Sequence, residues 1–339
     1  MDPAASAYLN GRISALSPHL LPPTRLEPLL DRDLSAALAP WGLAEVLESD
    51  LPPRAKNRAA EHRLIGHLLA DLEILVRPLS GPARELLVHW ARKYELANLK
   101  ALIRGKWHGL ARAAIEADLF ALPATIGLPH ETLLDAEDVP ELLLRLEQGP
   151  YRTFALQARR AFEEKREPFA LEGAIDRHYN TGLARRAREV PIPHPFEVQH
   201  LVGDLLDQFD IQWLLRYRFR YGLPPGEAYY LLTPSTRIMT RERLLALVEL
   251  DSPEAVTAAL PPPFDHLLGE ADTISEVDRR LEGYIQERIE GRLRHGLSAL
   301  GRALAFLVLR ELGLRRLLAL VRGRTLGLDA QLIRFAAGV

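Results

Sequence analysis

Three aspartates spaced three residues apart form the cluster in this sequence best suited to metal chemistry. Asp204, Asp207 and Asp210 lie in the segment DLLDQFD, and on a helix Asp204 and Asp207 would share one face. Two such carboxylates could hold Mg²⁺, but a site for a hard cation usually needs further oxygen ligands. We find no second acidic cluster placed to complete it. We therefore expect a solvated helix face and no metal.

Histidine, cysteine and glycine patterns offer no other route to catalysis. His62 and His67 are five positions apart and would not be neighbours on a helix. His178, His194 and His200 show no metal-binding spacing. The chain has no cysteine, which excludes disulfides and thiolate metal sites and suits a reducing compartment. The motifs GxxxxGK[ST], GxSxG and GxGxxG do not occur. We expect no catalytic residue and no cofactor.

Two cations separated by one residue close three predicted helices. The pairs are Arg104 and Lys106, Arg216 and Arg218, and Arg322 and Arg324. A Gly-Leu dipeptide follows each pair, and glycine takes the left-handed conformation that ends a helix. Cations in a last turn meet the negative end of the helix dipole, which contributes about 0.3–1 kcal/mol each. Two roles remain open: the pairs serve only helix ends and solvent, or some also form a contact ring for a partner.

The cation pairs belong to a unit that the chain repeats. YELANLKALIRGKWHGL (94–110) matches LGLRRLLALVRGRTLGL (312–328) at an offset of 322 − 104 = 218. Near half that offset lies DIQWLLRYRFRYGL (210–223), with one extra residue before Gly222. Upstream of each copy a leucine doublet precedes an aromatic residue: Leu29-Leu30 and Trp41, Leu133-Leu134 and Tyr151, Leu244-Leu245 and Phe264. LEGAID (171–176) also aligns with VDRRLE (277–282). Units of about 110 residues predict three domains, 1–118, 119–234 and 235–339.

Composition and periodicity predict an all-α protein. Hydrophobic residues make up 47% and charged residues 26% of the chain, as in soluble globular domains. Apolar residues recur at spacings of three and four, and strand-like alternation is almost absent. Each unit should contain short leading helices, two long helices, a Gly-Leu break and a short exit helix, with proline clusters between helices.

Membrane and nucleic-acid signals are weak. The net charge of −2 gives no strong attraction to nucleic acid or to anionic lipid. The N-terminal segment MDPAASAYLNGRIS lacks the features of a signal peptide. The most apolar stretch, LSALGRALAFLVLRELGLRRLLALV, carries five charged residues, so we expect no spanning helix. The segments LARRAREV and YRFRYG are basic, but no nucleic-acid-binding module is present.

The repeated motif resembles the C subunit of V/A-type rotary ATPases, the AC39 family, whose vacuolar member is called the d subunit. NLKALIRGKWHGL fits the family pattern of a basic helix end followed by Gly-Leu, and the other two copies fit it in order and spacing. The opening YLNGRISALSPHLLPPTRLEPLLD is similar to the family's N-terminal region. In one respect the chain departs from the pattern: only the first copy keeps the acidic residue and the asparagine, Glu95 and Asn98, whereas the third has Gly313 and Arg316.

The resemblance implies a mechanical role. Family members are funnel-shaped, with three similar helical domains in a pseudo-threefold arrangement. They sit peripherally on the cytoplasmic face of the membrane proteolipid ring and receive the end of the rotor shaft, made of D- and F-type subunits. They couple ion translocation to ATP synthesis or hydrolysis without a catalytic site of their own.

Two alternatives stay open at this stage. One is a cytosolic all-α scaffold that binds other proteins, although solenoid repeats of about 33–47 residues are much shorter than this unit. The other is a metal-dependent all-α enzyme built on the acidic cluster. The coupling ion and the direction of the parent enzyme are not encoded in this chain.

Overall fold

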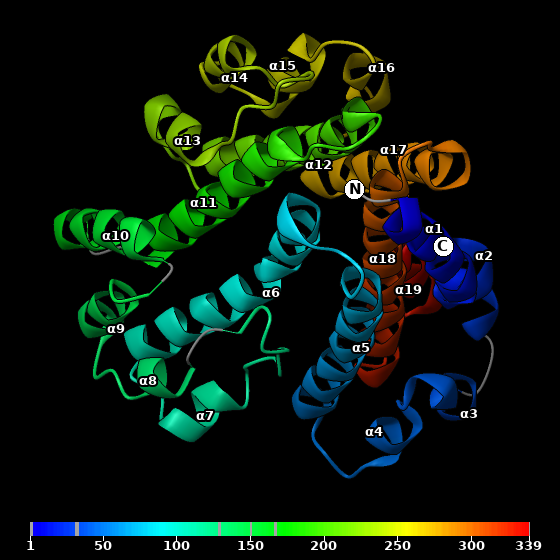
Figure 1. Ribbon diagram of the computed structural model, residues 1–339. Coiled ribbons are helices and arrows are strands. Elements are labelled where there is room, and N and C mark those ends of the chain that lie inside the picture. Colours follow the sequence, from blue (N-terminus) through cyan, green and yellow to red (C-terminus); the bar gives the residue numbers. More distant parts are fainter. Residues whose placement is uncertain (1–2, 31–33, 128–129, 150, 166–167, 339) are drawn as a thin grey trace. The chain divides into compact units, whose positions relative to one another are not determined.

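The computed structural model describes residues 3–30, 34–127, 130–149, 151–165 and 168–338, and every regular element in these ranges is helical (Figure 1). The all-α prediction is confirmed. The proline clusters lie between helices, as predicted, and several supply the first residue of the next helix: Pro53 starts α5 (Pro53–Val76), Pro195 starts α12 (Pro195–Leu215) and Pro225 starts α13 (Pro225–Leu231). Proline is well tolerated there because the first N–H groups of a helix have no partner within it.

The predicted order of elements occurs three times along the chain. The first copy, preceded by α1 (Pro3–Leu16) and η1 (Ser17–His19), contains α2 (Pro23–Leu26), η2 (Glu27–Leu29), α3 (Leu34–Leu38), η3 (Ala39–Trp41), α4 (Ala44–Glu48), α5, α6 (Gly81–Trp107) and α7 (Arg112–Glu116). The second contains α8 (His130–Leu134), α9 (Val139–Leu146), α10 (Arg152–Lys165), α11 (Pro168–Glu189), α12, η4 (Arg216–Arg220) and α13. The third contains α14 (Arg241–Val248), α15 (Pro253–Ala259), α16 (Phe264–Leu268), α17 (Ile274–His295), α18 (Ala299–Thr325) and α19 (Ala330–Ala337).

By contacts the chain forms two compact units, and the first joins its two ends. This unit comprises Met1–Ala101, Arg112–Leu128 and Ala299–Val339. Helix α18 is its centre, with α1, α5 and α19 packed along it (Figure 1). Because neighbours surround α18, apolar residues such as Phe306 and Leu317 are buried around its circumference. This packing explains the most apolar stretch of the sequence.

Ion pairs satisfy the charges that this apolar helix carries into the first unit. Arg310 of α18 is buried, and its Nε lies 3.0 Å from Oδ2 of Asp71 on α5. Glu311 accepts a hydrogen bond of 2.8 Å from the hydroxyl of Tyr94 on α6 and pairs with Lys93. A buried charge needs such a partner to offset its lost hydration.

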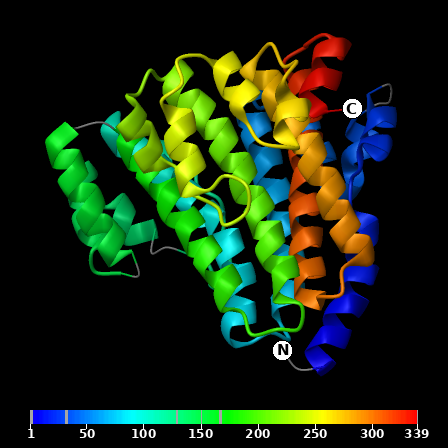
Figure 2. The same cartoon turned by 90° about the horizontal axis from the view of Figure 1, so that it is seen from above.

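The second unit comprises Leu102–Ala111 and Pro129–Ser298. Its long helices α11 and α12 lie side by side, and α17 packs on α12 (Figure 2). The short helices α13 to α16 pack onto the end of α12 around a core that includes Leu214, Tyr217, Met239 and Phe264. The core thus joins the end of the second repeat to the start of the third.

Two expectations about organisation have different outcomes. Among the described helices, none combines the length and apolar character needed to cross a bilayer. The three domains 1–118, 119–234 and 235–339, with their pseudo-threefold arrangement, stay a prediction.

Candidate functional site: the three cation pairs

The three helix ends that carry the cation pairs share one backbone geometry. Gly109, Gly222 and Gly327 have φ of 63°, 67° and 65°, so the predicted left-handed glycine is confirmed in every copy. In the first copy Leu110 N donates to the carbonyl of Gly105 over 2.9 Å, and in the third Leu328 N donates to Gly323 over the same distance. Each bond closes its helix.

The second copy accommodates its extra residue as a π-helical turn. The element η4 (Arg216–Arg220) widens the helix just before its end, and Leu223 N then donates to the carbonyl of Tyr217 over 2.9 Å. A π turn takes up one added residue without breaking the helix. The insertion seen in the sequence therefore preserves the Gly-Leu ending.

The first cation of each pair binds a carboxylate on a long helix of the following repeat. Arg104 Nε lies 2.7 Å from Glu172 of α11, Arg216 NH2 2.5 Å from Asp278 of α17, and Arg322 NH2 2.5 Å from Glu61 of α5. The side chains of Arg104 and Arg322 remain 58% and 45% exposed, against 22% for Arg216. The outer sides of Arg104 and Arg322 are therefore accessible to a partner.

The second cation of each pair binds a carbonyl at the end of a short leading helix. Lys106 Nζ donates to Leu134 O over 2.6 Å, Arg218 Nε donates to Val248 O over 2.6 Å, and Arg324 donates to Leu30 O. Leu134 and Val248 are the last residues of α8 and α14, and Leu30 directly follows η2. Cations are favourable at the C-terminal end of a helix, where carbonyls lack partners. The carbonyls contacted here belong to other helices.

Each of the six cations connects its own repeat to another repeat of the chain. The first pair binds elements of the second repeat, the second pair binds the third, and the third pair binds the first. Sequence reasoning missed the acidic partners Glu61, Glu172 and Asp278. A signal was present, because Glu172 and Asp278 occupy equivalent positions in the aligned segments LEGAID and VDRRLE. That the cations also contact another subunit stays a prediction.

A second set of equivalent residues, six positions before each first cation, holds the exit segments. Asn98 accepts from Phe120 N over 2.8 Å and donates to Phe120 O over 2.9 Å, and Asp210 accepts from Thr233 N over 2.9 Å. The third copy has Arg316, whose guanidinium lies so close to Gly338 that a Cβ there would be 3.3 Å from Nε. The Asn98 amide and the Asp210 carboxyl thus bind the backbone 22 and 23 residues downstream (120 − 98 and 233 − 210), and the Arg316 guanidinium lies beside Gly338, 22 residues downstream (338 − 316).

The expectation that Asp204, Asp207 and Asp210 form a solvated helix face was wrong. All three are buried, because this face of α12 packs against α17 and the segment that follows α13. Asp207 accepts from the hydroxyl of Ser235 over 2.5 Å and from Met239 N over 2.8 Å. These three aspartates, which we call the acidic row, therefore anchor the segment after α13 onto α12.

Asp204 is the centre of a cluster with three arginines. Its carboxylate lies 3.2 Å from Arg237 NH2, 3.2 Å from Arg288 Nε and 2.9 Å from Arg292 NH2. Gly203 makes room for Arg237, whose Cδ would lie 2.5 Å from a Cβ at that position. Three guanidinium groups therefore already surround this carboxylate, and their positive charge disfavours a metal cation beside it. Among the described residues, no three histidine or acidic side chains are grouped to hold a metal.

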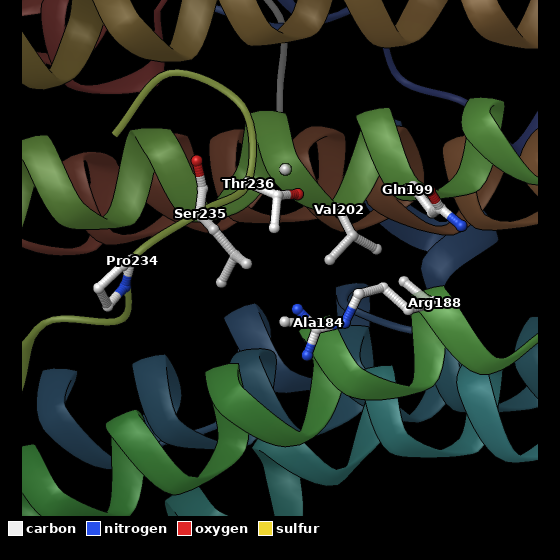
Figure 3. A pocket seen from close by; sticks show the side chains of 10 residues that line it. Ala184, Arg188, Gln199, Val202, Pro234, Ser235 and Thr236 are labelled. Atoms are coloured by element: carbon white, nitrogen blue, oxygen red, sulfur yellow. The ribbon is translucent and has the colours of Figure 1, made fainter. Parts of the chain in front are cut away.

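Beside this cluster, α11, α12 and the segment 234–236 line a small pocket. Figure 3 shows Ala184 and Arg188 of α11 on one side and Ser235 and Thr236 of the segment on the other. Gln199 and Val202 of α12 and Pro234 also line the pocket. Ser235 is itself held by Asp207, so the segment that closes the pocket is fixed by the acidic row.

Burial changes the acid–base properties of two carboxyls in the row. Burial raises the pKa of Asp207, and the hydrogen bonds from Ser235 and Met239 offset part of that rise. Burial raises the pKa of Asp210 well above its usual value, opposed by the hydrogen bond from Thr233. Desolvation disfavours the charged form when too few donors replace water. Of Asp207 and Asp210, Asp210 is therefore the carboxyl more inclined to retain its proton.

Comparison with known proteins places the whole chain in one family. The family described as ATP synthase (C/AC39) subunit matches residues 9–335. The C subunit of the A-type ATP synthase of Methanocaldococcus jannaschii is 22% identical over 352 aligned positions, which cover 98% of this chain and 86% of that protein. Its counterpart in the A-type ATP synthase of Haloquadratum walsbyi is 28% identical over 121 positions, 35% of each chain. Because the family match spans nearly the entire sequence, this chain belongs to the ATP synthase (C/AC39) subunit family.

Proposed function

We propose that this chain is the central-stalk subunit that joins rotor shaft and proteolipid ring in an A/V-type rotary ATPase. In this role it receives the shaft, made of D- and F-type subunits, and sits peripherally on the cytoplasmic face of the ring. It is non-catalytic and transmits torque between ion translocation and ATP synthesis or hydrolysis. The observation that carries the proposal is the family match over residues 9–335, together with the relatives from A-type ATP synthases.

The internal contacts of the chain support a mechanical role. A torque-transmitting part must resist deformation, and close-packed interiors have low compressibility. The contacts of the cation pairs recur between successive repeats, and the Asp204 cluster ties α12 to α17. These contacts join long helices directly, as stiffness requires.

The cation pairs remain our proposed partner interface. Within each pair the second cation binds inside the protein, and the first cation is the candidate for contact with a partner. Lys106, Arg218 and Arg324 bind carbonyls inside the protein. Arg104 and Arg322 are the members with the most exposed side chains among the first cations. A carboxylate from another protein of the complex could share their guanidinium groups, which carry several donors each.

Purification of the tagged chain from membranes of its source cells tests this proposal. We expect it to co-purify with shaft and proteolipid subunits, identified by mass spectrometry, and to leave the membrane when the soluble ATPase sector is mildly dissociated. A chain that stays in the supernatant without other ATPase subunits would instead support the scaffold. Stabilisation that depends on Mg²⁺ would support the enzyme alternative.

A further inference from the structure

The C-terminal end of the first unit carries an exposed apolar surface. Leu326, Leu328, Leu332 and Phe335 are 57%, 42%, 54% and 53% exposed, and we call these four residues the C-terminal patch. Leu332 and Phe335 are spaced as i and i+3 on α19, which places them on one side of that helix, and Leu326 and Leu328 lie in the segment just before it. The opposite side of α19 is buried on α18, where a Cβ at Gly323 would lie 2.6 Å from Ile333. The patch therefore faces outward.

The exit segments of the other repeats provide an internal comparison. The buried position of each exit segment is apolar in all three copies: Ile115, Ala228 and Ile333. The exposed positions equivalent to Leu332 and Phe335 are Ala114 and Ala117 in the first copy, and Glu227 and Tyr230 in the second. The fold thus requires an apolar residue on the inner side and tolerates small, charged or aromatic residues on the outer side. Leu332 therefore stands where the other two repeats have alanine or glutamate.

Positive charge borders the C-terminal patch. Arg322 and Arg334 flank it along the sequence, and Arg322 keeps 45% of its side chain exposed beside Glu61. The one acidic residue in this stretch, Asp329, caps α19 by accepting from Gln331 N over 2.8 Å. An apolar stripe with a basic border matches an apolar stripe with an acidic border.

We propose that the C-terminal patch docks an amphipathic α-helix of another ATP synthase subunit, with an apolar stripe flanked by Asp or Glu. Helices of this kind commonly bind exposed apolar surfaces through residues at i, i+3, i+4 and i+7. A second copy of this chain is disfavoured because it would place arginines opposite arginines. The inference rests on the proposed function, since it needs a partner within the ATPase.

Photo-crosslinking within the assembled complex tests the docking. A benzoylphenylalanine at Leu332 is expected to crosslink to an apolar and acidic helical segment of one partner protein, located by mass spectrometry. The same probe at Tyr230, the equivalent exposed position of Phe335 in the second repeat, should not label that segment. Labelling of lipid, labelling of a second copy, or no labelling in an intact complex would overturn the inference.

Matched substitutions provide the second measurement. Leu332→Ser with Phe335→Ser should weaken binding of the crosslinked partner by about tenfold or more, with an unchanged melting temperature. Arg334→Glu should weaken it as well, and Arg334→Lys should largely restore it. The control, Ala114→Ser with Ala117→Ser, should bind like the original chain. If the original chain assembles and the patch variants assemble equally, the docking site is wrong and the proposed function stands. If the original chain captures no ATPase subunit, both fail.

Discussion

Replacing Asp204 by asparagine is expected to lower the free energy of unfolding by about 3–5 kcal/mol. The carboxylate is buried and lies within 3.2 Å of guanidinium groups from Arg237, Arg288 and Arg292. Asparagine keeps the shape but removes the negative charge at the centre of this cluster, so three cations would be left facing one another. The arginine side chains are 18–33% exposed, and solvent screening places the expected loss near the lower end of that range.

Urea-induced unfolding of the purified chain measures this loss. The exposed residue Glu287 lies on α17, the helix that carries Arg288 and Arg292, so Glu287→Gln is a matched control with an expected change within about 0.5 kcal/mol. A loss below about 1 kcal/mol for Asp204→Asn would contradict the role that we assign to the cluster.

Asp210 and Asn98 occupy equivalent positions, and giving each the residue type of the other should change stability in opposite directions. Asp210→Asn should raise the free energy of unfolding by about 1–3 kcal/mol near pH 8, because it replaces a buried carboxyl whose Oδ1 accepts from Thr233 while its Oδ2 has no donor among the described residues. The reverse change, Asn98→Asp, should lower it by a similar amount. Asn98 uses its amide to donate to Phe120 O, and a carboxylate would place negative charge against that carbonyl.

The pH dependence of the Asp210→Asn effect tests its cause. Because burial raises the pKa of Asp210 in the folded state, the folded protein binds this proton more tightly than the unfolded chain. Stability from this residue is therefore greatest below the unfolded pKa and is lost as pH rises through the folded pKa. The advantage of the asparagine variant should grow across that window and then level off. If the asparagine variant were more stable by the same amount at pH 4 and pH 8, ionisation of Asp210 would not be the cause of the difference.

Local features of the fold could be predicted from the sequence because they depend on neighbouring residues. The left-handed conformations of Gly109, Gly222 and Gly327 follow from their place after a helix, and Asp329 caps α19 as its type predicts. Likewise, the extra residue of the second copy was visible before Gly222. The structure adds that η4 accommodates it as a π turn.

Other contacts of the candidate site could not be predicted, because their partners are backbone groups or residues distant in sequence. Lys106 and Arg324 bind backbone carbonyls, which leave no mark in an amino-acid sequence. The burial of Asp204 depends on arginines from α17 and from the segment after α13, so spacing alone gave the wrong environment. Asp210 looked unlike Asn98 by residue type, although both hold an exit segment.

Coupling measured in membrane vesicles tests the central claim most directly. Vesicles that contain the complete ATPase would be stripped of the soluble sector and this chain, then rebuilt with or without the purified chain. We predict that ATP hydrolysis drives ion uptake only when the chain is present, and that vesicles rebuilt without it lose uptake. Equal ATP-driven ion uptake with and without the chain would contradict the proposed role as the link between shaft and ring.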